Sequence, residues 1–247
     1  MRKFILLTND DGITAPGIQI LRETAAPVWD CVSVAPDREQ SAQSHALTLT
    51  RPLRVEEIGE GIMSVDGTPT DCVMLALRGL LDRRPDLVIS GINSGANLGD
   101  DVIYSGTVAG AAEATILGVP AIAVSIVEPD STDIAWAAGI ALKVAGMVME
   151  KSLPEGVFLN VNIPPEWTGK QFEITCLGTR SYRDVITRKL DPRGRPYYWI
   201  GGQMEAWKGT GKSDFAAIGR GNVSITPLHL DMTASHVIEE MESWSFE

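Results

Sequence analysis

The chain begins with an apolar stretch that runs directly into two adjacent carboxylates, and this feature restricts the fold most. Residues 4–8 form the pattern of a buried strand, and Asp10, Asp11 and Gly12 follow at its carboxyl end. Adjacent carboxylates repel each other and are costly to remove from water, so this position needs a cation or free access to solvent. In open parallel sheets, ligands collect at the carboxyl ends of strands. The segment therefore indicates a metal site, although Asn, Asp and Gly also form ordinary turns.

The first two-thirds of the chain alternates strand-like and helix-like segments. This alternation is typical of a parallel sheet with helices on both faces. We expect an α/β fold, a Rossmann-like three-layer α/β/α sandwich, in residues 1–178, and a C-terminal oligomerisation arm and tail in residues 179–247. The expected strands are 4–8, 31–35, 62–65, 86–90, 120–127, 158–163 and 221–227, the expected helices are 16–25, 70–81, 108–117 and 133–151, and a hairpin is expected to pair 46–50 with 53–56.

The character of the chain changes after about Gly178, where charged and turn-forming residues replace the apolar segments. Residues 191–196 form the pattern of a hairpin tip, and the aromatic strand 197–200 follows it. Aromatic side chains on a projecting hairpin favour burial in a subunit interface. We therefore expect this hairpin to lie in a subunit interface.

The charge and the cysteines exclude several classes of protein. A formal net charge of -11 argues against binding to a nucleic-acid polymer or to an anionic membrane. The apolar stretches are too short or too interrupted for a signal peptide or a membrane span. Cys31, Cys72 and Cys176 lack the spacing of metal ligands and suit small core residues in a reducing compartment. These features predict a cytoplasmic location.

Three further loops follow strands and should meet the carboxylates in one crevice. Ser41 lies in the first loop and offers a hydroxyl oxygen, and Asn93 lies in the second and offers an amide oxygen, both suited to a hard cation. The third loop, 104–107, opens a helix and presents free N–H groups beside two hydroxyls, which is an arrangement suited to phosphate. Each loop also has a plain structural interpretation as a turn or a helix cap.

Other residues give weaker signals. His45, His229 and His236 are scattered without ligand spacing, and we interpret them as solvated or structural histidines. The sequence Gly-Thr-Pro at 67–69 is interpreted as a turn and helix cap. The first strand is not followed by Gly-x-Gly-x-x-Gly, which disfavours a Rossmann dehydrogenase.

Several motifs, taken in their order and spacing, resemble the SurE family of survival-protein 5'-nucleotidases. The Asn-Asp-Asp-Gly opening combined with the Ser-Gly-Ile-Asn loop is specific, whereas either alone would be weak. The resemblance covers nearly the whole chain. It is carried by the motifs at 8–12, 35–41, 67–69, 90–97, 104–108, 197–199, 213–217 and 223–228.

The resemblance implies a metal-dependent hydrolase, a phosphatase that acts on nucleoside 5'-monophosphates, with a Rossmann-like N-terminal domain and a C-terminal region used in dimer or tetramer formation. It implies one bound divalent cation, magnesium or manganese, held by a metal-binding set of Asp10, Asp11, Ser41 and Asn93. The expected phosphate-binding residues are Asn97, Ser105, Gly106 and Thr107.

We expect attack on phosphorus by metal-activated water, with Asp10 or Asp11 as the catalytic residue that orients the water or accepts its proton. Direct attack by a carboxylate usually needs a second Asp two positions later, where this chain has Gly12. The alternative from another class is a phosphate or nucleotide sensor that binds a ligand without turnover. A third hypothesis is an oligomeric stress protein that acts through its aromatic arm.

Overall fold

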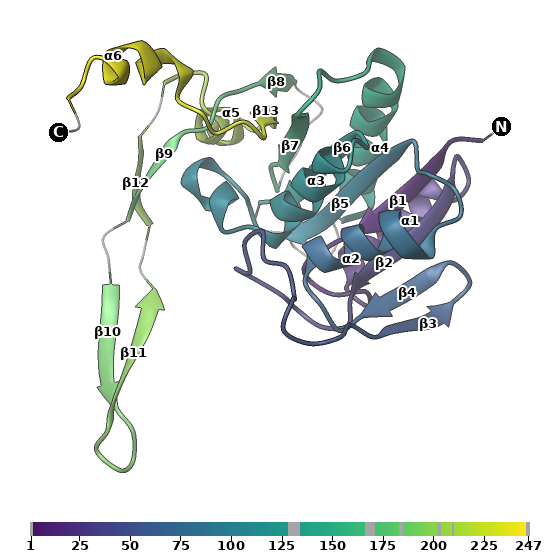
Figure 1. The fold of residues 1–247 in the computed structure, drawn as a ribbon, viewed down its shortest axis with the longest axis horizontal. Coiled ribbons are helices and arrows are strands. Elements are labelled where there is room, and N and C mark those ends of the chain that lie inside the picture. The colour runs from purple at the N-terminus through teal and green to yellow at the C-terminus, as the bar shows by residue number, and fades with distance from the viewer. Residues whose placement is uncertain are drawn as a thin grey trace.

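A nine-stranded sheet runs through the computed structural model, which describes residues 2–127, 134–165, 171–182, 185–201, 204–208 and 210–245. The strand order is β3-β4-β2-β1-β5-β6-β7-β13-β8 (Figure 1). The strands of this sheet are β1 (Phe4–Thr8), β2 (Asp30–Pro36), β3 (Val55–Gly59), β4 (Ile62–Val65), β5 (Leu87–Ser94), β6 (Ala121–Ile126), β7 (Val157–Ile163), β8 (Phe172–Ile174) and β13 (Val223–His229).

The central strands β4, β2, β1, β5, β6 and β7 are parallel to one another. The chain builds outward from β1 to β2 and β4 on one side, and then crosses back to place β5 on the other side of β1. The carboxyl ends of β1 and β5 therefore border the point at which the strand order reverses. In folds of this kind that point is where ligands bind.

Helices cover both faces of the sheet (Figure 1). Helices α1 (Pro16–Ala25) and α4 (Ile134–Lys151) pack together on one face, and α2 (Pro69–Leu75) and α3 (Gly106–Ile116) pack on the other. Strand β1 supplies Ile5 and Leu7 to the first layer and Leu6 to the second, and all three are fully buried. Burial on both faces explains why this strand is continuously apolar.

The expected three-layer α/β architecture is confirmed, but the hairpin expected between 46–50 and 53–56 is wrong. Strand β3 instead pairs antiparallel with β4. Residues 46–50 form no strand because side chains bind their backbone groups: Thr48 N donates to Asp71 at 2.9 Å, and the Thr68 hydroxyl donates to the Ala46 carbonyl at 2.7 Å. The expected helix 70–81 is α2 followed by a π-helical turn at Ala76–Leu80.

The expectation for the cysteines holds only in part. Cys72 is buried as expected, whereas Cys31 is only partly buried and Cys176 is exposed. The expected start of the long helix at Asp133 lies outside the described residues. In the described part of the chain, no helix is both long enough and apolar enough to cross a membrane.

An arm of four strands projects from the sheet (Figure 1). Strand β9 (Thr179–Tyr182) pairs with β12 (Met204–Lys208), and β10 (Val185–Leu190) pairs with β11 (Pro196–Gly201) beyond them. After the arm, the chain forms α5 (Asp214–Gly219) and returns to the sheet as β13, before a 3-10 turn (Ser235–Val237) and α6 (Ile238–Glu242). The chain thus leaves the sheet after β8, and β13, which lies beyond the boundary expected at residue 178, belongs to that sheet.

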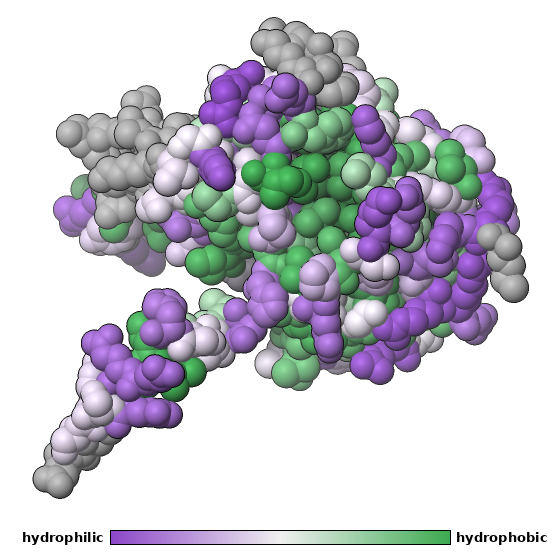
Figure 2. Space-filling view, turned by 90° about the horizontal axis from the view of Figure 1, so that it is seen from above, coloured by the Kyte–Doolittle hydropathy of each residue, from purple (hydrophilic) through white to green (hydrophobic). Residues whose placement is uncertain are grey.

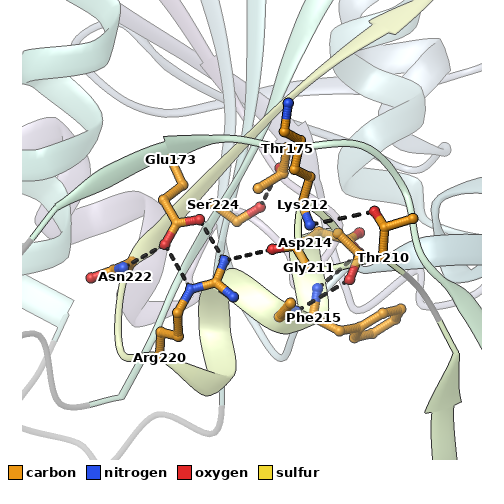
Figure 3. A network of polar contacts seen from close by, with 12 residues as sticks. Glu173, Thr175, Thr210, Gly211, Lys212, Asp214, Phe215, Arg220, Asn222 and Ser224 are labelled. Atoms are coloured by element: carbon orange, nitrogen blue, oxygen red, sulfur yellow. Dashed lines mark hydrogen bonds and ion pairs between the residues drawn. The ribbon is translucent and has the colours of Figure 1, made fainter.

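Polar contacts fasten the base of the arm, and Figure 3 shows those between Arg220 and Glu173. The Asp214 carboxylate, which is fully buried, accepts from the backbone N–H groups of Gly99 at 2.7 Å and Gly178 at 2.9 Å. Close by, Arg220 donates to Glu173 on β8 at 3.0 Å. These bonds join α5 to the start of the arm and to the 3-10 turn at Gly99–Ile103.

Apolar side chains also gather between α4 and β8, as Figure 2 shows from above. They line a hollow of about 540 Å³ on the surface. Met147 and Ile174 are more than half exposed there, and Lys143 lies over the Phe172 ring with its amine 4.8 Å from the ring centre.

Candidate functional site

The carboxyl ends of β1, β2 and β5 bring the predicted loops to one edge of the sheet. Asp10 and Asp11 follow β1, and Asn93 lies at the end of β5. The loop after β2 is tied to the first carboxylate, because Gln40 N donates to the Asp10 carbonyl at 2.8 Å. The end of β5 is tied to the second, because Ser94 N donates to the Asp11 carboxylate at 3.2 Å.

Asp10 is a buried acid with only 5 % of its surface exposed. Its pKa is raised to about 6, chiefly by burial and also by the neighbouring charge of Asp11, although hydrogen bonds from the hydroxyl and backbone N–H of Thr107 act in the opposite direction. The ionised form is therefore destabilised by its surroundings. A cation beside it would relieve this cost.

Asp11 is partly buried, and burial raises its pKa as well. The Ser94 N–H group opposes this shift, and the charge of Glu39 adds to it. A cavity of about 160 Å³ adjoins Asp11 and Asn93, and apolar residues, including Ile92 and Ile126, form much of its wall. The carboxylate thus has solvent-sized space on one side, as a metal ligand or a group that contacts substrate would need.

The end of β5 is shaped by a glycine. Gly91 has φ +144°, and a Cβ there would lie 2.4 Å from the Val124 carbonyl oxygen of β6, so only glycine fits. The peptide bond between Gly91 and Ile92 is cis, and the β5–β6 register shifts between Ser90 and Asn93. The Asn93 side-chain N–H group donates to the Gly95 carbonyl at 2.8 Å. The amide oxygen is consequently the side-chain atom left to accept or to bind a cation.

The start of α3 lies against Asp10. The Ser105 hydroxyl caps the helix by accepting from Val108 N at 3.1 Å, and the Thr107 hydroxyl donates to Asp10. At Gly106 a Cβ would lie only 2.8 Å from the Asp10 Cβ. Three of the four residues predicted to bind phosphate thus adjoin a predicted metal ligand, and the first turn of the helix faces a negative charge, which a helix amino terminus favours.

Asn97 lies in a buried network of asparagines. Its side chain donates to the Ser125 hydroxyl at 2.7 Å, its N–H group donates to Asn162 at 2.9 Å, and its carbonyl accepts from Asn160 and Asn162. The network holds the loop after β5 against β6 and β7. In the sequence, this network is indicated only by the two asparagines in the otherwise apolar strand 158–163, and nothing in the sequence links them to the site.

Ser41 is exposed and donates to the Glu39 carboxylate at 2.7 Å. In the described residues no group of three His, Cys, Asp or Glu side chains could hold a metal. A cation here would therefore depend on two carboxylates and neutral oxygens, a set that fits a hard cation such as magnesium or manganese. Next to the pair in the chain, the Asn9 side-chain oxygen is buried and has no hydrogen-bond partner among the residues that the structure describes.

Comparisons with known proteins agree with this geometry. The sequence model of the family described as Survival protein SurE matches residues 5–184. The chain is 54 % identical over 243 residues to the 5'-nucleotidase SurE of Geotalea daltonii, and this match covers 97 % of this chain and 98 % of the relative. It is 48 % identical over 247 residues to the 5'-nucleotidase SurE of Moorella thermoacetica, and that match covers 97 % of this chain and 95 % of the relative. The crystal structure of SurE protein from Aquifex aeolicus superimposes with a TM-score of 0.87 at 42 % identity, over 97 % of this chain and 98 % of that one.

Proposed function

The chain belongs to the SurE family, and from this premise we propose that it is a 5'-nucleotidase that hydrolyses nucleoside 5'-monophosphates to nucleoside and phosphate. The observation that carries the proposal is the pair formed by the buried Asp10 and the partly buried Asp11 at the reversal point of the sheet, with Asp10 against the first turn of α3. A relative named for this activity is 54 % identical along nearly the whole chain.

We propose that Asp10, Asp11, Ser41 and Asn93 hold one divalent cation, magnesium or manganese. The cation would supply positive charge that stabilises the phosphoryl group during attack by water. The raised pKa values of both carboxyls support this assignment, because burial disfavours their ionised forms and a neighbouring cation would favour them. Ser41 would have to exchange its bond to Glu39 for this role.

Residues of the protein itself would supply the remaining functions, which are proton transfer and the stabilisation of charge on the phosphate. Asp10 or Asp11 would orient the attacking water or accept its proton. The Thr107 hydroxyl fixes the orientation of the Asp10 carboxylate. The first turn of α3, with Ser105 and Gly106, would stabilise charge on the phosphoryl oxygens, because N–H groups at a helix start favour anions. Asn97, which its buried network holds in place, would also bind the phosphate group.

The activity is tested by incubating the purified protein with AMP, GMP and their 3'-phosphate isomers, in magnesium, in manganese and in chelator. The proposal requires metal-dependent phosphate release from the 5' isomers. Nucleotide binding without release would instead support the sensor alternative, and release that is unchanged by chelator would refute the metal-dependent mechanism.

We further propose that the protein is a homodimer or a homotetramer. Arm residues Trp199 and Ile200 are 64 % and 93 % exposed, and such side chains favour burial against another chain. The apolar hollow between α4 and β8 is a second surface that a neighbouring copy could cover.

A further inference from the structure

The loop of residues 40–48 connects β2 toward β3 without regular structure, and it touches two parts of the site. At its start, Gln40 N donates to the Asp10 carbonyl at 2.8 Å. In its middle, Ser44 N donates at 3.1 Å to the carbonyl of Tyr104, the residue before the α3 cap. Ser41, a proposed metal ligand, lies between these two contacts. The position of this loop therefore bears on both the cation and the phosphate ends of the site.

His45 fastens the loop to α3. Its Nε2 atom lies 2.8 Å from a carboxylate oxygen of Glu113, whose side chain is 5 % exposed, while the His45 side chain is 37 % exposed. Among the described residues His45 is the one hydrogen-bond partner found for the Glu113 carboxylate. A buried carboxylate without a partner is strongly disfavoured, so this contact pulls the histidine, and the loop with it, onto the helix.

The loop needs such an anchor because its backbone is strained. Ala42 has φ 57° and Ser44 has φ 52°, both in the left-handed region that residues with a Cβ rarely adopt. Residues in such conformations persist only where the surrounding contacts hold them. The contacts available are those of Gln40 and Ser44 on the site side, and of His45, Ala46 and Thr48 on the helix side.

We propose that His45 is a positioning residue for substrate: through Glu113 it preorders the loop 40–48 across the phosphate end of the site. This inference rests on the proposed 5'-nucleotidase function. When the loop is ordered only part of the time, the apparent affinity for substrate falls by the fraction of the protein that is competent. Once substrate has bound and ordered the loop, the chemical groups stand as before, so the loss falls on KM and leaves kcat nearly unchanged.

The test compares His45→Ala, His45→Asn and His45→Gln. Glutamine places its amide N–H near the position of Nε2 and can still donate to Glu113, whereas asparagine is too short. We expect KM for AMP to rise about five- to tenfold in the alanine and asparagine variants, with kcat within about twofold of wild type, and to return toward wild type in the glutamine variant. His236→Ala, at an exposed histidine near the C-terminus, is the matched control and should change neither constant.

A measurement without substrate separates this inference from the proposed function. Amide hydrogen exchange in the segment 40–48 should quicken in His45→Ala and stay at the wild-type rate in His45→Gln. An inactive wild-type protein would refute the nucleotidase proposal. Amide hydrogen exchange would still test whether the His45–Glu113 contact orders the loop. An active wild type with an unchanged KM in His45→Ala, or exchange in that variant that matches wild type, would overturn the role of His45.

Discussion

Asp10 is the residue at which burial and charge conflict most. Its folded-state pKa of about 6 lies above the ordinary value of 3.8, so the folded protein without metal binds the Asp10 proton more tightly than the unfolded chain does. The stabilising contribution of this group is complete below about pH 4 and is lost as the pH rises through 6. In the metal-free protein at neutral pH, Asp10 therefore weakens the fold.

A substitution isolates this effect. In metal-free protein, Asp10→Asn should be more stable than wild type at pH 7, by at most about 3 kcal/mol from a shift of about two pKa units, and the difference should vanish near pH 4. Thermal melting in chelator from pH 4 to 8 measures both proteins. A gap between the two curves that is independent of pH would contradict the assignment of this pKa to Asp10.

At the same scale, the sequence identified residues whose chemistry is local and missed those whose role depends on contacts. Asp10 and Asp11 could be predicted because two carboxylates after a buried strand are costly anywhere. His45 was interpreted as solvated or structural, and nothing local to it shows that Glu113, 68 positions away, would be buried opposite it. Likewise the network around Asn97 joins residues from three separate segments.

Among the elements, α3 links the sheet to the site. It begins at Gly106, two residues before the expected start, and the small residue at this position lets the helix approach Asp10. Strand β5 runs four residues beyond the expected end at Ser90, because Gly91 permits a backbone conformation and an approach to β6 that residue preferences do not reveal. The misassigned hairpin has a similar cause, since Asp71 and Thr68 bind residues 46–48 from α2.

Paired glycine substitutions test the close approach of α3. Gly106→Ala puts a Cβ 2.8 Å from that of Asp10, so we expect kcat/KM to fall at least about tenfold and stability to fall by about 1–3 kcal/mol. A Cβ at Gly139 in α4 would have no described atom of another element within 4 Å, so Gly139→Ala should leave activity unchanged while raising stability by about 0.5–1 kcal/mol. Equal effects at the two positions in kinetics and urea unfolding would show that the approach to Asp10 is unimportant.

On the scale of the whole molecule, the sheet and the arm make different demands on the chain. The sheet buries its strands between two helical layers, and the alternation of strands and helices that builds it could be predicted from the sequence. The arm exposes aromatic and aliphatic side chains, and its base is fixed by buried contacts of Asp214 that link segments far apart in the chain. The sequence indicated a projecting hairpin, whereas the return of β13 to the sheet was not expected.

Removal of the outer hairpin tests the arm. Replacement of residues 185–201 by a short Gly-Ser linker should lower the mass of the assembly measured by light scattering. It should leave the melting temperature nearly unchanged, because β10 and β11 do not belong to the nine-stranded sheet. The matched control, Trp199→Ser with Ile200→Ser, should weaken association while keeping the arm. Unaltered mass in both variants would exclude the hairpin as the subunit contact.

The most direct test of the central claim is the rate of phosphate release from AMP as manganese is titrated into metal-free wild type, Asp10→Asn and Asp11→Asn at saturating substrate. The account predicts no release without metal, saturable activation of wild type, and turnover at least about a hundredfold lower in Asp10→Asn at every manganese concentration. Wild-type turnover in Asp10→Asn, or full activity in chelator, would contradict it.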